Sequence, residues 1–168
     1  MADQNSDAPS RPAWHALLGL LPEDAVPLRQ PVAPPEVLAG PTGSAVAGWE
    51  QLVLHLSAGA AGSRTVLVVL DASGTLLSAS DSVLYSTGLS GAPQPPEDPP
   101  AMIHVESVGG RFEPDGSFWG TRWHSVAVER GGDEEPEWDS TRSEPSADDV
   151  AGLRSVVAEL IPRQPPRA

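Results

Sequence analysis

The chain has 168 residues and a formal net charge of −13, and its ten basic residues other than histidine are all arginines. This acidic balance excludes a basic nucleic-acid footprint and predicts repulsion from an anionic membrane. The absence of cysteine excludes disulfides, thiolate catalysis and thiolate-ligated metals, and no cofactor is expected.

The N-terminal segment, residues 1–43, is predicted to be extended and rich in proline, with an edge strand near Val26 to Val32. It lacks the pattern of a signal peptide, and no apolar run reaches membrane-spanning length, so a soluble, cytoplasmic protein is expected. A short apolar cluster within this segment either packs back on the domain or docks on a partner. The cluster residues predicted to contact a partner are Trp14, Leu17, Leu18 and Leu21.

Residues 44–161 are predicted to form a single α+β domain, followed by a proline and arginine tail over residues 162–168. The domain is expected to begin with an amphipathic helix over residues 44–57, capped by Ser44. His55 would then face solvent. The apolar residues spaced as on one helical face are Val46, Trp49, Leu52, Val53 and Leu56.

A first hairpin follows this helix. The run from Thr65 to Leu70 is apolar in both alternation phases, which predicts a central strand over 64–70 that is buried on both faces. Asp71 to Thr75 predicts a hairpin loop with Gly74 in the left-handed region, and a return strand over 75–85. The predicted pairing places Leu70 opposite Leu76, and Val68 opposite Ser78.

A second hairpin is predicted from residues 101–112 and 117–129, because Pro114, Asp115 and Gly116 suit a tight turn between them. Alternation divides this hairpin into two faces. One face is predicted to pack on the helices, and it carries Ile103, Val105, Trp119, Trp123 and Ala127. The other face carries Met102, Val108, Phe112, Phe118, Val126 and Val128 around a charged centre of His104, Glu106, Arg122 and His124.

The last part of the chain begins with an acidic segment and ends with a helix over residues 147–161, capped by Ser146 and stopped by Pro162. The acidic segment, which runs from Glu134 to Asp149, is either a solvated loop or a surface for a basic partner. The elements together predict an α+β fold. It consists of an antiparallel sheet of four or five strands, in two consecutive hairpins, with two amphipathic helices on one face.

The charged centre of the second hairpin is the candidate site. The predicted register makes Glu106 and His124 neighbours, which suits acid–base chemistry. The bland alternative is a cross-strand ion pair on a solvated face, worth less than about 1 kcal/mol. His104 and His124 lie at a diagonal distance that permits chelation, but a third ligand would have to come from Glu106 or elsewhere, so no metal is predicted. The residues predicted to contact a ligand are His104, Arg122, Phe112 and Phe118.

The leading functional prediction is a non-catalytic accessory or binding protein that acts through a protein partner, as an adaptor, a complex subunit or an immunity or inhibitor protein. It follows from the acidic charge and from the lack of any phosphate loop, metalloprotease, hydrolase or dinucleotide-binding motif. The alternative is a small-molecule-binding domain or a simple acid–base enzyme with its pocket on the 101–129 hairpin. The sequence assigns no family.

Overall fold

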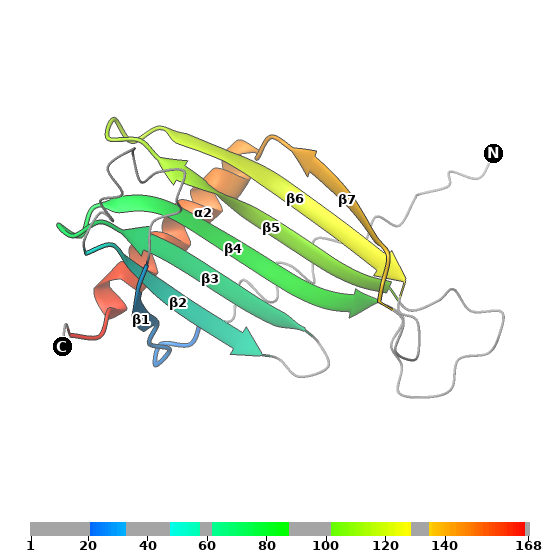
Figure 1. Ribbon diagram of the computed structural model, residues 1–168, viewed down its shortest axis with the longest axis horizontal. Coiled ribbons are helices and arrows are strands. Elements are labelled where there is room, and N and C mark those ends of the chain that lie inside the picture. The colour runs from blue at the N-terminus through cyan, green and yellow to red at the C-terminus, as the bar shows by residue number, and fades with distance from the viewer. Residues whose placement is uncertain (1–20, 33–47, 58–61, 88–101, 129–134, 167–168) are drawn as a thin grey trace, which may run out of the picture.

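The computed structural model describes residues 21–32, 48–57, 62–87, 102–128 and 135–166. Within these residues, seven strands form one antiparallel sheet, and each strand pairs with the one before it in the chain (Figure 1). The strands are β1 (Leu28–Pro31), β2 (Glu50–Ser57), β3 (Ser63–Leu70), β4 (Leu76–Thr87), β5 (Met102–Phe112), β6 (Phe118–Val128) and β7 (Trp138–Ser143). They are followed by the helix α2 (Ala147–Leu160) and the 3-10 turn η2 (Ile161–Arg163).

The helix α2 packs on one face of the sheet, which we call the inner face. The opposite, outer face is turned toward the viewer in Figure 1, where α2 lies behind the strands. The buried side of α2 consists of Leu153, Val157 and Leu160. It packs against apolar residues of β2 to β5, namely Leu52, Leu54, Val66, Val68, Leu70, Ala79 and Val108.

The predicted fold class is wrong. Four or five strands with two amphipathic helices were expected, whereas the described residues form seven strands with α2 as their one α-helix. The helix predicted over residues 147–161 is observed as α2, with Ser146 as its cap. The helix predicted over residues 44–57 is not, because residues 50–57 of that range form β2.

The error over β2 has a physical cause. Leu52, Leu54 and Leu56 alternate with less buried residues and therefore fit the period of a strand as well as that of a helix. The decisive fact is non-local, because β3 pairs with β2 along one side and with β4 along the other. β3 was predicted to be buried on both faces, which is wrong, since only every second residue is buried. A central strand needs neighbours on both sides to satisfy its backbone groups, so residues 50–57 become the second neighbour. His55 is exposed in β2, with its Nδ1 atom 2.9 Å from Thr65 Oγ1.

The second hairpin is observed in the predicted register, with Glu106 opposite His124 and Phe112 opposite Phe118. The first hairpin differs by one residue. Leu70 does face Leu76, but the register shifts between Val69 and Leu70, so Val68 faces Ala79 rather than Ser78.

The assignment of the two faces is also wrong. The face predicted to pack on the helices is the outer face, where Trp119 is 65% exposed and Trp123 39% exposed. Phe112 and Phe118, from the opposite face, pack on the core that α2 covers. Alternation separates the faces of a strand, but it does not show which of them a helix will cover.

The two edges of the sheet are β1 and β7. β1 forms where an edge strand was predicted, near Val26 to Val32. β7 was missed, because residues 138–143 lie in the acidic segment that was predicted to be a loop or a docking surface. All six residues of β7 are exposed, so the sequence has no apolar run that would predict this strand.

Candidate functional site

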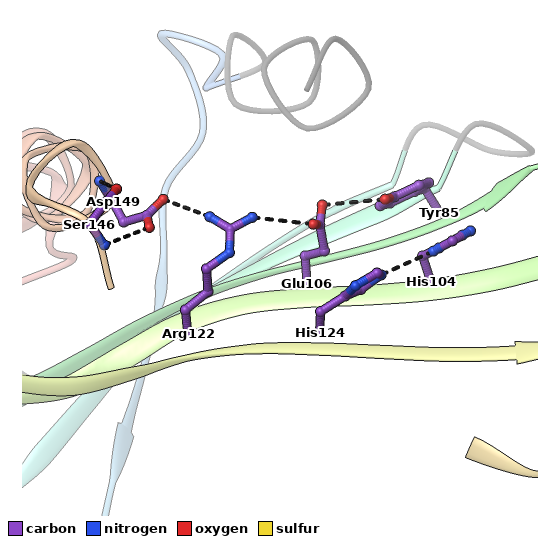
Figure 2. Close-up of polar contacts among 7 residues, drawn as sticks. All are labelled: Tyr85, His104, Glu106, Arg122, His124, Ser146 and Asp149. Atoms are coloured by element: carbon purple, nitrogen blue, oxygen red, sulfur yellow. Dashed lines mark hydrogen bonds and ion pairs between the residues drawn. The ribbon is translucent and has the colours of Figure 1, made fainter. Parts of the chain in front are cut away.

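The charged centre of the second hairpin lies on the inner face, beyond the first turn of α2 (Figure 2). Antiparallel pairing aligns Tyr85 of β4 with His104 of β5, and Glu106 of β5 with His124 of β6. Arg122 lies two residues before His124 in β6 and therefore points to the same side of the sheet. The structure thus brings together His104, Glu106, Arg122 and His124, as the sequence predicts.

A chain of polar contacts ties this cluster to the helix. Arg122 Nη1 lies 2.8 Å from Asp149 Oδ1 in the first turn of α2, and Arg122 Nη2 lies 3.3 Å from Glu106 Oε1. The Tyr85 hydroxyl donates to Glu106 Oε2 over 3.3 Å. Figure 2 shows this chain running from Ser146 and Asp149 through Arg122 and Glu106 to Tyr85. We call these contacts the inner polar network.

The two histidines form a separate pair beside it. His104 Nδ1 and His124 Nε2 are 3.1 Å apart, so the N–H of one ring donates a hydrogen bond to the nitrogen of the other. The His104 ring is nearly parallel to the Tyr85 ring, at a centroid distance of 4.9 Å, and nearly coplanar with the His124 ring, at 5.4 Å. Burial, and next the nearby charge of His124, lower the pKa of His104, although the Glu106 carboxylate opposes this shift.

Two other groups of the network have displaced pKa values. Burial, and next the charge of Glu106, raise the pKa of Tyr85 to about 12. The Tyr85 hydroxyl therefore stays a neutral donor even above pH 10.0, where an ordinary tyrosine has mostly lost its proton. Burial raises the pKa of Asp149, but the hydrogen bonds from Ser146 and the charge of Arg122 outweigh it, so that the pKa is lowered overall.

The network differs from the predicted acid–base pair in its partners. Glu106 and His124 are neighbours in register, yet the hydrogen bonds of Glu106 go to Tyr85 and Arg122, and that of His124 goes to His104. Phe112 and Phe118 contact each other at the turn end of the hairpin and pack on the core under α2. They do not form walls around the polar network.

A second polar pair on the inner face escaped the sequence analysis. Arg64 Nε and Nη2 donate to the two carboxylate oxygens of Asp81 over 2.9 and 2.7 Å. Their side chains are only 1% and 3% exposed. The sequence did carry a signal for this pair. An aspartate lies within one predicted strand, and an arginine is the first residue of another strand that is otherwise apolar. Tyr85 and Asp149 were also missed as partners of Glu106 and Arg122.

The outer face has different chemistry. Three tryptophans are exposed there or at its edge: Trp119 (65%), Trp123 (39%) and Trp138 (42%). A cavity of about 280 Å³ opens between two of them and is lined by Val105, Ser107, Trp123, Ser125 and Trp138.

Trp123 is held in place by its neighbours. Its Nε1 atom donates to Ser125 Oγ over 2.6 Å, and Ser125 Oγ in turn lies 2.8 Å from Ser140 Oγ. The Arg142 guanidinium stacks over its ring at 4.5 Å. A further cavity of about 400 Å³ lies at the end of β6 and β7, lined by Val128, Glu137, Trp138 and Asp139. Neither cavity includes a residue of the inner polar network.

The remaining predicted residues are distributed as follows. Leu21 is half-buried against the core, whereas Trp14, Leu17 and Leu18 lie outside the described residues. Among the described residues, no three histidine, aspartate or glutamate side chains gather in a way that could hold a metal ion. None of the described helices has the length and apolar character needed to cross a membrane.

The chain matches no protein-family model, and no curated protein or solved structure matches it significantly.

Proposed function

We propose that the chain is a non-catalytic binding protein that acts through a protein partner, and that the partner binds the outer face. The observation that carries this proposal is the exposure of Trp119, Trp123 and Trp138 around a face on which no described helix packs. Tryptophan is the residue most enriched at the centres of protein interfaces, and exposed apolar patches mark such surfaces.

The cavity on the outer face supports the proposal. Its two indole walls and the Val105 side chain suit a large apolar side chain of a partner. The stacking of Arg142 and the hydrogen bond to Ser125 fix Trp123, so less side-chain freedom is lost on binding. The net charge of −13 favours a basic partner through attraction at long range. An adaptor, a complex subunit and an immunity or inhibitor protein all fit this mode of action.

The proposal is tested by affinity capture from the native host with matched variants. Ser107→Arg fills the cavity with a charged side chain, and Trp119→Ala removes the most exposed indole. Ser155→Arg makes the same serine-to-arginine change on an exposed position of α2 and serves as the control. We expect a protein that the wild type and Ser155→Arg retain and that the two outer-face variants lose. Reconstitution of the complex from purified proteins completes the test. Equal retention by all variants, or recovery of the chain alone, contradicts the proposal.

The rival proposal is a small-molecule-binding or acid–base function on the inner face. The observation that favours it is the gathering of titratable side chains with displaced pKa values, namely Tyr85, His104 and Asp149. It predicts that Glu106→Gln lowers the pKa of His104 further in an NMR titration, because the Glu106 carboxylate raises that pKa in the wild type. A His104 titration that is unchanged by Glu106→Gln removes the support for this rival.

A further inference from the structure

The two edges of the sheet differ in how they are protected. β1 has four residues, ends in Pro31 and is preceded by the buried Pro27. Proline lacks a backbone donor, so it blocks the addition of another strand at that edge. β7 has six residues, all of them exposed, and its nearest prolines, Pro136 and Pro145, lie two residues outside the strand. It offers a regular row of backbone donors and acceptors along the edge opposite β1.

We infer that β7 pairs antiparallel with β7 of a second copy of this chain, which joins the two sheets edge to edge. The inference goes beyond the proposed function because it concerns the backbone edge of β7, although Trp138 of β7 also lines the cavity of the outer face. The joined sheets would place the two outer faces on the same side, with their tryptophans next to each other.

The side chains of β7 select one register for this pairing. In an antiparallel pair, directly opposed side chains lie on the same face of the sheet. The outer-face residues of β7 are Trp138, Ser140 and Arg142, and its inner-face residues include Asp139 and Thr141. In a two-fold symmetric pair of β7 strands, each outer-face residue is therefore opposite an outer-face residue of the second copy. Each inner-face residue is likewise opposite an inner-face residue.

The register centred on Ser140 is the favourable one. It places Trp138 opposite Arg142 of the second copy, and the symmetry repeats this contact. Arg142 already stacks one side of its guanidinium on Trp123 at 4.5 Å, and the second copy's Trp138 would cover its other side. Tryptophan is the best aromatic partner for a cation–π contact, and arginine is the cation that most often makes one. Asp139 would face Thr141, so no like charges would be opposed.

The other registers centred between Asp139 and Arg142 are worse. A register centred on Asp139 opposes two aspartates, and one centred on Arg142 opposes two arginines, which is destabilising in a sheet. A register centred on Thr141 opposes no like charges, but it pairs Arg142 with Ser140 and Trp138 with Glu144. Both contacts between arginine and tryptophan are then lost.

The natural absence of cysteine allows a direct test of the pairing and its register. Only the residue on the two-fold axis faces its own copy, at a Cβ separation of about 5 Å, close to what a disulfide needs. Under mild oxidation of the full chain, we expect Ser140→Cys to form a disulfide-linked dimer much faster than Thr141→Cys or Asp139→Cys. Thr121→Cys, exposed on β6, measures random collision, and the same oxidation in urea measures pairing that does not depend on the fold. Fastest cross-linking at position 139 or 141 overturns the register, and equal rates at all positions overturn the pairing.

A second measurement uses the chain without added cysteine. A single strand pair makes a small interface, so we expect a dissociation constant on the order of 10–100 µM. Sedimentation of the wild type from about 10 to about 500 µM should then show a species of twice the chain mass of 17.5 kDa. Arg142→Glu should weaken the dimer about tenfold or more, because both stacking contacts are lost, while Arg142→Lys should weaken it less. A wild type that stays monomeric throughout, or an Arg142→Glu dimer of unchanged affinity, overturns the inference.

The two proposals fail separately. If no dimer is found but Ser107→Arg still abolishes partner capture, only this inference is overturned. If the dimer is found but Ser107→Arg and Trp119→Ala leave partner capture unchanged, only the proposed function is overturned.

Discussion

The two faces of the sheet are built from the same strands and alternate residue by residue, yet they differ in almost every physical respect. The inner face places Leu52, Val66 and Val68 under α2 with no exposed surface. The outer face keeps three large indoles in water. The comparison shows that residue type alone does not decide burial, because α2 and not tryptophan content determines which face becomes the core.

The inner face is itself divided. Under α2 it is apolar, and beyond the first turn of the helix it carries ionisable groups that partner one another. Arg64 pairs with Asp81, and Arg122 pairs with Glu106 and Asp149. Buried charges are tolerated only when they are paired, and the Arg64 and Asp81 side chains, which are 1% and 3% exposed, meet this condition.

The largest expected effect sharpens the contrast between buried and exposed charges. Asp81→Ala should lower the free energy of unfolding by about 4 kcal/mol, because it leaves the buried Arg64 guanidinium without its carboxylate. The control is Glu113→Ala, which breaks an ion pair to Arg111, whose side chain is 70% exposed, and should cost less than about 1 kcal/mol. Urea unfolding of both variants checks this, and equal losses would contradict the assignment of Arg64 and Asp81 to a closed interior.

The next prediction concerns the pKa of Tyr85, the one tyrosine of the chain. Tyrosinate absorbance should titrate near 12 instead of the ordinary 10.0, and Glu106→Gln should lower that midpoint. Because the folded pKa is raised, the stabilising contribution of the neutral hydroxyl is complete below pH 10.0 and is lost as the pH rises toward 12. A titration midpoint at the ordinary value would mean that the Tyr85 hydroxyl is exposed to water. The inner face would then be no more buried than the outer face at this position.

A smaller effect is expected at the cap of α2. Ser146 accepts from the Asp149 backbone N–H, and its own N–H donates to the Asp149 carboxylate. Ser146→Ala should therefore cost about 1 kcal/mol in the free energy of unfolding. Ser155→Ala, on an exposed position of the same helix, is the control and should stay within about 0.5 kcal/mol of the wild type. If both variants unfold alike, the anchoring of α2 at the polar half of the inner face is not supported.

The sequence predicts local features well and non-local ones poorly. The register of the second hairpin follows from Pro114 to Gly116, since a tight turn fixes which residues oppose each other. The common face of Glu106, Arg122 and His124 follows from that register. Their partners Tyr85 and Asp149 come from elements 21 and 27 residues away, and no short-range pattern indicates such contacts.

The errors share the same origin. Residues 50–57 carry apolar residues that fit two periods, and only the pairing with β3 decides between them. The inner and outer faces were exchanged because the position of α2 over the sheet is set by packing between elements far apart in the chain. β7 was missed because an exposed edge strand needs no apolar pattern.

The most direct test of the central claim, that the outer face serves binding while the inner face holds the fold together, compares one variant from each face by urea unfolding. Leu153→Ala creates a cavity in the core under α2 and should lower the free energy of unfolding by about 3 kcal/mol. Trp119→Ala, a larger truncation at a 65% exposed position, should lower it by no more than about 0.5 kcal/mol. A loss for Trp119→Ala as large as that for Leu153→Ala would mean that the outer face is part of the core, and would contradict the account.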